Sequence, residues 1–411
     1  MKKMIFSAVA FAVVAVSAVA VAPTTSEAIP AFARQTGAAC LSCHFQSFPT
    51  LSAFGRSFKQ NAFTDMGEQA LVEDDAMSIP AVLNATVVFR PQFSQVKTTG
   101  AATTKEISYG DQVVLIGGRI GENAGAFIEL GGGAFGNHQL ITSWDVGGVK
   151  AGVSYYNTGF GENAGMQLQN SWGQHGGMMG MRDTSANQQI FKGEATAGGQ
   201  IAGLTAHVMT DMFTVQAGLI APSIDAAGWG VTGNSTWTAA KLVRGDVFLD
   251  VAGMTAGLGA TYVGGNVGDA VANAYGTVAG GIAPQLELNR WGIDGQLEGE
   301  MGHTQFGLYA DYASAGKSTA TKTNGYNLST VDVLKGFGIH GTVKPLHNVV
   351  FGAGYGELKL GATKTKTYNI AAEYEIYQNF VVALSYTNQK VTTGAASVST
   401  KTTLLDVEAL M

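Results

Sequence analysis

Two cysteines and a histidine lie close together in the run Cys40-Leu41-Ser42-Cys43-His44. This C-x-x-C-H spacing is the attachment signature of a c-type haem, in which both thiols bond to the porphyrin and the histidine binds the iron. The chain has no other cysteine, so no structural disulfide competes for these thiols. We therefore expect one covalently bound haem c on Cys40 and Cys43, with His44 as the proximal iron ligand.

Two simpler uses of a C-x-x-C pair are a disulfide and half of a zinc site. A structural zinc ion takes four ligands, and the chain offers no second cysteine pair. A redox dithiol is expected inside a βαβ pattern, and none surrounds this run. Both alternatives are weaker than haem attachment.

The first residues predict export. Lys2 and Lys3 precede an apolar run over 4–22, and Ser26-Glu27-Ala28 is a small-x-small cleavage site. This is the pattern of a secretory signal peptide over 1–28. Its removal takes away two lysines and one glutamate, which moves the formal net charge from −6 to −7. An acidic chain of this kind excludes nucleic acid as a natural partner.

Composition sets the mature chain apart from ordinary soluble domains. Charged residues make up 13% of it and there are 56 glycines, about half and about twice the usual shares. After the signal, no further apolar run reaches the 18 residues that a spanning helix needs. Another architecture has to account for this composition.

Period-two alternation supplies that architecture. It is clear over 81–93, 306–312, 367–376 and 380–387. In the third range one face holds Tyr368, Ile370, Ala372, Tyr374 and Ile376, and the other holds Thr367, Asn369, Ala371, Glu373 and Glu375. Such segments are strands with one apolar face and one polar or small face.

Roughly sixteen to eighteen such segments of about ten residues recur to the C-terminus, the length a tilted strand needs to cross a bilayer. We predict an all-β transmembrane barrel of about 16 antiparallel strands over 80–411. A small, mainly helical haem segment over 29–79 would plug or cap its lumen, entering from the periplasmic side. A soluble β-sandwich would need more surface charge, and a solenoid would show a fixed repeat period.

Two long links are expected to be external loops. They are Val96–Asp111 and Gly159–Asn187. The second contains His175, Met178, Met179 and Met181, whose imidazole and thioether groups could bind copper. A flexible external loop is the preferred interpretation.

Several residues of the haem segment could contact the porphyrin. Phe54 stands at helical spacing with other apolar residues and could cover a haem face, although ordinary helix packing gives nearly the same geometry. Arg34, Arg56 and Lys59 could pair with the haem propionates, or could be solvated or face carboxylates in the lumen. The residues alone do not choose between these roles.

The second axial ligand is also open. Met66 and Met77 are the only methionines of the segment, and methionine opposite histidine raises the reduction potential of a c-type haem. Met77 is preferred because it comes just before the first strand and could fold back. Met66 or a lumen histidine such as His207, His303 or His340 are the alternatives.

The segment "IPAFARQTGAACLSCHFQSFPTLSAFGRSFKQNAF" resembles the N-terminus of the fused monohaem cytochrome–porins of iron-oxidising bacteria. The shared pattern is P-x-FARQTG, then C-x-x-CH, then P-x-L-x-x-FGR-x-FK. "SIPAVLNATVVFR" and "VVLIGGRIGENAGAFIEL" also look like the opening barrel strands of that family. The resemblance is strong over about 29–130 and is one of architecture beyond.

The resemblance implies an iron:cytochrome oxidoreductase of the cell outer membrane. Extracellular Fe(II) would be the electron donor, and a periplasmic c-type cytochrome would be the acceptor. The rival functions are a haem-bearing conduit for another donor or acceptor, and a diffusion porin in which haem is a structural plug. One departure from outer-membrane barrels is the C-terminus, Ala409-Leu410-Met411, which lacks the usual terminal aromatic residue. Either this weakens the signal for barrel assembly, or Leu405, Val407, Ala409 and Met411 alone form the final lipid face.

Overall fold

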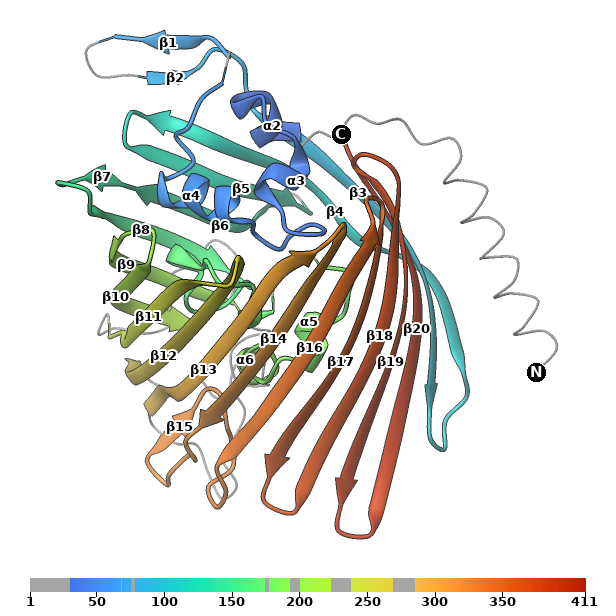
Figure 1. Ribbon diagram of the computed structural model, residues 1–411. Coiled ribbons are helices and arrows are strands. Elements are labelled where there is room, and N and C mark those ends of the chain that lie inside the picture. The colour runs from blue at the N-terminus through green and yellow to red at the C-terminus, as the bar shows by residue number, and fades with distance from the viewer. Residues whose placement is uncertain are drawn as a thin grey trace.

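The structure is a computed structural model that describes residues 30–67, 69–74, 78–132, 134–173, 177–192, 200–222, 238–268 and 285–411. In these residues the chain forms one closed β-barrel with a helical N-terminal segment at one end (Figure 1). The expected signal peptide, Met77 and His175 lie outside the described residues. No helix in the described part is long and apolar enough to cross a membrane.

The barrel is built from long strands that follow the chain in order. They are β3 (Ala85–Thr98), β4 (Thr104–Gly121), β5 (Ala124–Gly131), β6 (Ala134–Thr142), β7 (Trp144–Asp145), β8 (Lys150–Thr158), β9 (Ile201–Met209), β10 (Phe213–Pro222), β11 (Ala240–Val251), β12 (Met254–Gly268), β13 (Gln285–Met301), β14 (Thr304–Ala315), β15 (Lys322–Asn324), β16 (Leu334–Leu346), β17 (Val349–Leu360), β18 (Thr363–Tyr377), β19 (Phe380–Thr393) and β20 (Ala396–Leu410).

Sixteen of these strands form the wall in the described residues, because β7 continues β6 along β8 and β15 is a short segment beside β13. All wall neighbours pair antiparallel. The last strand pairs with the first, with Leu405 opposite Phe93 and Leu410 opposite Val88. The predicted barrel of about 16 antiparallel strands is confirmed.

The strand faces are also those that alternation predicts. On β18, Tyr368 and Ile370 are exposed on the outside, whereas Asn369, Ala371 and Glu373 are buried. On β11, Val243 and Val247 face out, and Arg244 and Asp246 face the lumen. An apolar outside with a polar inside is the pattern of a barrel that crosses lipid.

Outward aromatic residues form a band across β13 to β19. Trp291 contacts Tyr312, with ring centroids 5.4 Å apart, and Tyr355 contacts both Phe337 and Tyr368. Tyr312 stands opposite Phe337 in the strand register. Such a band marks a membrane–water interface. The outer ends of β16 to β20 run on beyond it, as the long hairpins at the lower edge of Figure 1 show.

The two ends of the barrel differ. At one end the strands are joined by tight turns such as 252–253, 302–303, 347–348 and 378–379. The opposite end carries the longer links 159–200, 223–239, 269–284 and 316–333. Both ends of the barrel sequence, Ala85 and Leu410, lie at the short-turn end.

Two loop expectations were wrong. Val96–Asp111 is mostly strand, because β3 and β4 extend into a long hairpin with only 99–103 as the turn. Gly159–Asn187 is not a flexible external loop in its described parts. It folds into the lumen as η1 (Ala164–Met166), η2 (Asn170–Trp172), α5 (Met181–Thr184) and the start of α6 (Ala186–Phe191), and most of its side chains are buried.

The N-terminal segment occupies the short-turn end. It consists of α2 (Pro30–Thr36), α3 (Cys40–Cys43) and α4 (Ala53–Gln60), followed by a hairpin of β1 (Leu71–Glu73) and β2 (Ser78–Pro80). Phe32, Phe58 and Phe63 pack together, with centroids 5.2 to 5.6 Å apart. This cluster is the apolar centre of a segment too small to bury a large core by itself.

Hydrogen bonds fasten residues 30–67, which we call the plug, to the wall on several sides. The Ala31 N–H donates to Thr86 Oγ1 on β3 at 2.8 Å. The Arg119 N–H on β4 donates to Gln35 Oε1 at 3.0 Å. Other bonds reach the β9–β10 turn, β13 and β16 (Gln60 to Thr210, Arg56 to Glu298, Lys344 to Gln46). The plug therefore spans the lumen from wall to wall.

Candidate haem site

The C-x-x-C-H run forms a single helical turn. The N–H of His44 donates to Cys40 O at 2.9 Å and closes α3. Residues three and four apart share a helix face, so this turn gathers both thiols and the imidazole. Neither cysteine forms a disulfide, and Cys40 Sγ donates to Asn379 Oδ1 in the β18–β19 turn at 3.0 Å.

The electrostatics of Cys43 disfavour a spontaneous metal or redox site. Burial raises the pKa of Cys43 to about 11, and the carboxylate of Asp65 adds to the effect. The thiolate is the form that binds zinc and exchanges disulfides, and at neutral pH this residue stays a thiol. Within the described residues, no group of three or more His, Cys, Asp or Glu side chains could hold a metal ion.

His44 is set up as a ligand through Nε2. Its Nδ1 lies 3.2 Å from the carbonyl oxygen of Thr50. Because a carbonyl only accepts, Nδ1 must donate, which places the lone pair on Nε2. Burial lowers the pKa of His44 to about 4, against the smaller opposite effect of backbone hydrogen bonds at Thr50 and Pro49. A neutral imidazole fixed by a carbonyl is the arrangement found at metal-binding histidines.

A cavity opens beside this turn. It encloses about 50 Å³, and about 520 Å³ when the open space at its mouth is counted. Cys40, Leu41, His44 and Gln46–Phe48 line one side, and inward residues of β16 to β20 line the other. The enclosed part alone is too small for a porphyrin, so a bound macrocycle would extend through the mouth at the short-turn end.

The barrel side of the cavity is polar and incompletely bonded. Among the described residues, Asn348 finds no hydrogen-bond partner for either side-chain atom although it is 4% exposed. Glu373 Oε2 and Gln46 Nε2 are also buried without partners. Unsatisfied polar atoms at this depth indicate that water or a ligand completes the site. The donor set and these unpartnered atoms fit a haem at the cavity mouth.

The other predicted haem contacts are not among the residues that line this cavity. Arg34 donates to Ala85 O on β3. Arg56 is 3.5 Å from Glu298 and lies over the ring of Phe248 at 4.8 Å, so it is engaged by the wall. Phe54 is 46% exposed on α4. Lys59 donates to Gln167 O at 3.1 Å, and burial lowers its pKa to about 8.

Gly55 allows α4 to pack closely against the C-x-x-C-H turn. A Cβ at Gly55 would lie 2.0 Å from Cys43 O, which is closer than real contacts allow. The side chain of Ser52 caps α4 by accepting from the Gly55 N–H at 3.1 Å, and the Ser52 N–H donates to Cys43 O at 2.9 Å. The F-G-R sequence therefore has a steric role at its glycine.

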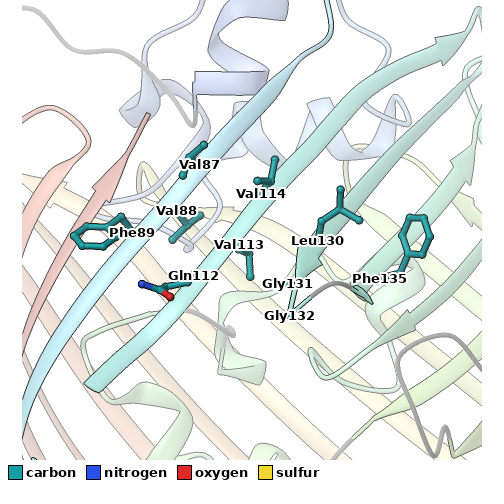
Figure 2. A pocket seen from close by; sticks show the side chains of 10 residues that line it. All are labelled: Val87, Val88, Phe89, Gln112, Val113, Val114, Leu130, Gly131, Gly132 and Phe135. Atoms are coloured by element: carbon teal, nitrogen blue, oxygen red, sulfur yellow. The ribbon is translucent and has the colours of Figure 1, made fainter. Parts of the chain in front are cut away.

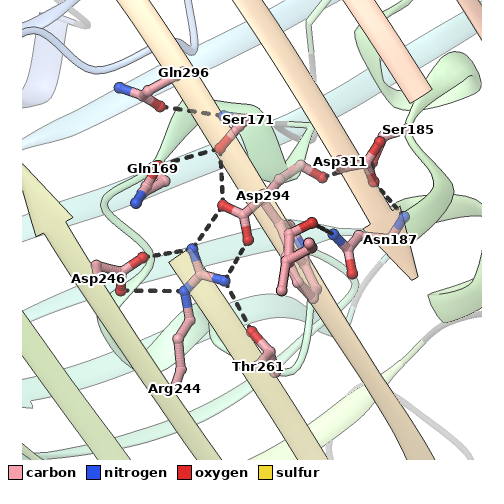
Figure 3. A network of polar contacts seen from close by, with 12 residues as sticks. Gln169, Ser171, Ser185, Asn187, Arg244, Asp246, Thr261, Asp294, Gln296 and Asp311 are labelled. Carbon is pink, nitrogen blue, oxygen red and sulfur yellow. Dashed lines mark hydrogen bonds and ion pairs between the residues drawn. The ribbon is translucent and has the colours of Figure 1, made fainter. Parts of the chain in front are cut away.

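The segment 159–187, which folds into the lumen and which we call the inward loop, is held against the wall by buried charged residues (Figure 3). Arg244 bonds Asp246 at 2.5 Å and Asp294 at 2.8 Å, and the three side chains are almost fully buried. Asp294 in turn accepts from Ser171 Oγ at 2.8 Å. Asp311 accepts from the side chain of Ser185 and from the first backbone amides of α6 (Ala186 at 3.1 Å, Asn187 at 2.6 Å).

The plug and the inward loop meet inside the barrel. The Leu51 N–H donates to Asn170 Oδ1 at 2.7 Å, and Asn170 Nδ2 returns a bond to Leu51 O at 3.0 Å. Asn170 also bonds Glu298 on the wall at 2.5 Å. The described lumen is thus filled from the short-turn end into its middle.

Met179 and Met181 of the inward loop lie near the cavity beside His44, which the sequence did not suggest. Met179 and Met181 line a small cavity whose other wall is Gln46–Thr50. Met179 forms an apolar cluster with Val350 and Ala371, and Val350 also lines the haem cavity. The inward loop reaches this part of the wall only because of the strand register. The sequence around Met179 and Met181 therefore could not predict their position.

The lumen histidines are buried on strands. His207 is 2% exposed and His340 3%. Among the described residues, neither nitrogen of His207 has a partner, and His340 Nε2 has none. His303 is exposed in the β13–β14 turn. Neither buried histidine is among the residues that line the cavity beside His44.

Another cavity lies elsewhere in the barrel wall. It holds about 550 Å³ between β3, β4 and the short β5–β6 hairpin, and its lining is mostly apolar, with Val87, Phe89, Val114 and Phe135 among its members (Figure 2). It shares no residue with the cavity beside His44. Its lining carries no group suited to redox chemistry, so it is not the haem site.

Comparison with known proteins identifies the class of fold. No family model matches the chain, and no curated protein matches its sequence. Among solved structures, OprB of Pseudomonas putida is similar at 12% identity with a TM-score of 0.54, covering 80% of this chain and 94% of that one. The outer membrane channel DcaP of Acinetobacter baumannii is similar at 11% identity with a TM-score of 0.50, covering 80% and 97%. These likenesses show a porin-type barrel fold.

Proposed function

We propose that this protein is an outer-membrane electron-transfer barrel that carries one covalent c-type haem. Cys40 and Cys43 would hold the porphyrin, and His44 would bind the iron. When bound, the haem supplies one-electron redox chemistry with a potential set by its ligands and surroundings. The observation that carries the proposal is the C-x-x-C-H turn lodged in the lumen, with His44 Nδ1 fixed by Thr50 O at 3.2 Å.

The net reaction that the proposal assigns is one-electron transfer across the outer membrane. One extracellular Fe(II) is oxidised to Fe(III), and one oxidised periplasmic c-type cytochrome is reduced. The donor follows from the resemblance of residues 29–130 to monohaem cytochrome–porins. Another donor or acceptor would use the same site, so the donor is tested separately below.

The fold supports an orientation for this transfer. Tight turns and both ends of the barrel sequence mark the periplasmic end of outer-membrane barrels, and the plug lies at that end. The cavity mouth beside Cys40 and His44 would then face the periplasm, where a soluble acceptor docks. The long hairpins would project outside the cell.

The chain's own residues shield the site. The inward loop and the plug would exclude bulk water from the middle of the barrel, and the hydrogen bond from Ser171 to Asp294 keeps the loop in place. Low solvent access and fixed charges are two means by which a protein tunes a haem potential.

A diffusion porin is the second candidate, and the porin-type fold favours it. The filled lumen opposes it, because Leu51, Asn170 and Glu298 form a continuous bridge from plug to loop to wall. Solute conductance of the full-length protein in a planar bilayer decides between them. The electron-transfer proposal expects a nearly closed barrel, and steady porin-sized conductance would support the diffusion porin.

Met179 would be a further candidate to bind the haem iron, beside Met77 and Met66. Met179 packs against Val350, a residue of the cavity wall. In the holoprotein, Met179→Leu is expected to abolish the sulfur-to-iron charge-transfer band of the oxidised protein and to lower the reduction potential. Met181→Leu is the matched control on the same cavity. If Met77→Leu loses the band and Met179→Leu keeps it, Met77 is the ligand, as the sequence predicts.

The decisive experiment takes the membrane-inserted protein and measures covalent haem, then its reduction. Cys43→Ser should leave a folded barrel without two-point covalent attachment, and the wild-type protein should be reduced by Fe(II) at a rate that rises with Fe(II) concentration. A normal haem spectrum with no reduction by Fe(II) would reject the donor. A folded barrel without covalent chromophore would reject the whole proposal.

A further inference from the structure

Lysines gather on the outside of the projecting hairpins. Eight of the seventeen lysines of the chain lie on β3, β4 and β16 to β20, beyond the aromatic band. We call these eight the lysine belt: Lys97, Lys105, Lys335, Lys359, Lys364, Lys366, Lys390 and Lys401. Six of them are exposed and the other two, Lys364 and Lys366, are partly exposed.

Strand parity places the belt on the lipid side of the wall. Tyr368 and Ile370 face outward on β18, so Lys366 and Lys364, two and four residues from Tyr368, face outward too. Leu405 and Phe93 face outward on β20 and β3, which puts Lys401 and Lys97 on the same face. None of these side chains points into the lumen.

The register sets lysine directly against lysine. The opposite pairs are Lys335–Lys359, Lys359–Lys364, Lys366–Lys390 and Lys97–Lys401. Like charges directly opposite one another weaken a strand pair. Glu357 is the acidic partner within reach of the belt, bonding Lys364 at 3.1 Å and Lys366 at 3.8 Å. An excess of aligned like charge is tolerable when an anion lies across it.

The height of the belt matches the polar layer of the membrane. Lys366 stands two residues beyond Tyr368, and Lys359 stands four beyond Tyr355. Two to four residues advance a strand by about 7 to 13 Å, or roughly 5 to 9 Å of height at a tilt near 45°. The headgroup layer beyond the hydrocarbon is about 5 to 8 Å thick on each side, and aromatic belts sit at its inner edge.

We infer that the lysine belt binds the phosphate groups of a phosphorylated glycolipid of the lipid A type in the outer leaflet. The inference rests on the outer-membrane location and outward hairpins of the proposed function, but not on the haem. The acyl chains of such a lipid would lie along outward residues such as Ile370 and Phe351, and its phosphates would bridge facing lysines. The contact would hold neighbouring hairpins together and cancel their repulsion.

The test compares two triple variants of the full-length barrel. Lys335→Gln, Lys359→Gln and Lys390→Gln together remove charge from the belt. Lys241→Gln, Lys317→Gln and Lys322→Gln together are the matched control, because none of these lysines stands opposite another lysine in the strand register. Lys241 on β11 faces Gly264 and Leu219. Affinity for lipid A in detergent, measured by the shift of the thermal midpoint with lipid concentration, should fall roughly hundredfold in the first variant, at about fivefold per lysine. The control should match wild type.

The probes separate lipid from free anion. Dephosphorylated lipid A and inorganic phosphate should each fail to shift the wild-type midpoint at concentrations where lipid A saturates. Equal lipid A affinity in the two variants would overturn the inference, as would equal stabilisation by the dephosphorylated lipid or by phosphate alone. Covalent haem content, measured on the same samples, keeps this result separate from the proposed electron transfer.

Discussion

Substitution of Gly55 by alanine tests how the C-x-x-C-H turn is held in the plug. Two effects oppose each other. Alanine favours a helix over glycine by roughly 0.5–1 kcal/mol, which would stabilise α4. The added Cβ would lie 2.0 Å from the backbone oxygen of Cys43, and overpacking of this kind costs typically 1–3 kcal/mol and occasionally more.

The steric effect should win, because the contacted atom is backbone and cannot rotate away. With the cost near the upper value, the net loss is about 2 kcal/mol, which corresponds to roughly a thirtyfold rise in the undocked plug. The assay is the rate of proteolysis of the plug in the detergent-solubilised, haem-loaded protein, together with haem absorbance per folded barrel.

Gly245→Ala is the control, since a Cβ at Gly245 meets no atom within 4 Å. It should leave both readouts unchanged. If Gly55→Ala protects the plug as well as or better than wild type, helix propensity has won and the close packing of α4 on α3 is refuted.

Two further predictions concern charge. Because burial holds the pKa of Lys59 near 8, below its unfolded value of about 10.4, the unfolded state binds more protons between these values. The cost of burying the ammonium is therefore fully present below pH 8 and disappears as the pH rises to about 10.4. Plug protection from protease should increase over that window, and Lys59→Met should remove the increase while Lys317→Met keeps it. Arg244→Ala should cost about 3–5 kcal/mol in urea unfolding of the barrel, because it leaves Asp246 and Asp294 buried and unpaired. Lys322→Ala, which removes a partly exposed ion pair with Glu287, should cost under about 1 kcal/mol, and equal losses would contradict the buried clamp.

The sequence predicted the barrel well because strand parity is a local property. The odd and even positions of 367–376 already separate the lipid face from the lumen face, and the structure follows them residue by residue on β18. The outward residues of the last strand over 405–411 could be predicted for the same reason. Closure of β20 on β3 was expected from chemistry, since lipid tolerates no open sheet edge.

The position of the inward loop could not be predicted from sequence, because it depends on partners far away in the chain. Asp311 and Asp294 attach it to the wall from more than 120 residues away in sequence. A glycine-rich, polar stretch has the same composition outside a barrel as inside one. The hydrogen bonds that fix it come from strands whose order only the closed barrel defines.

The candidate site was only partly predictable. The spacing of Cys40, Cys43 and His44 predicts haem attachment without any knowledge of the fold, since one helical turn is enough to gather these residues. The cavity wall, by contrast, comes from five strands near the C-terminus. Arg56 could not be assigned from sequence because its partner, Glu298, is 242 residues away.

The cavity beside His44 has a consequence for the order in which the protein matures. Two of its residues, Glu408 and Leu410, belong to the last strand, whereas Cys40 belongs to α3, near the start of the described chain. The pocket is therefore complete only when β20 pairs with β3 and closes the barrel. A chromophore would have to join the thiols before the barrel closes, or reach them afterwards from the short-turn end. A chain cut short near its end would lose one side of the pocket.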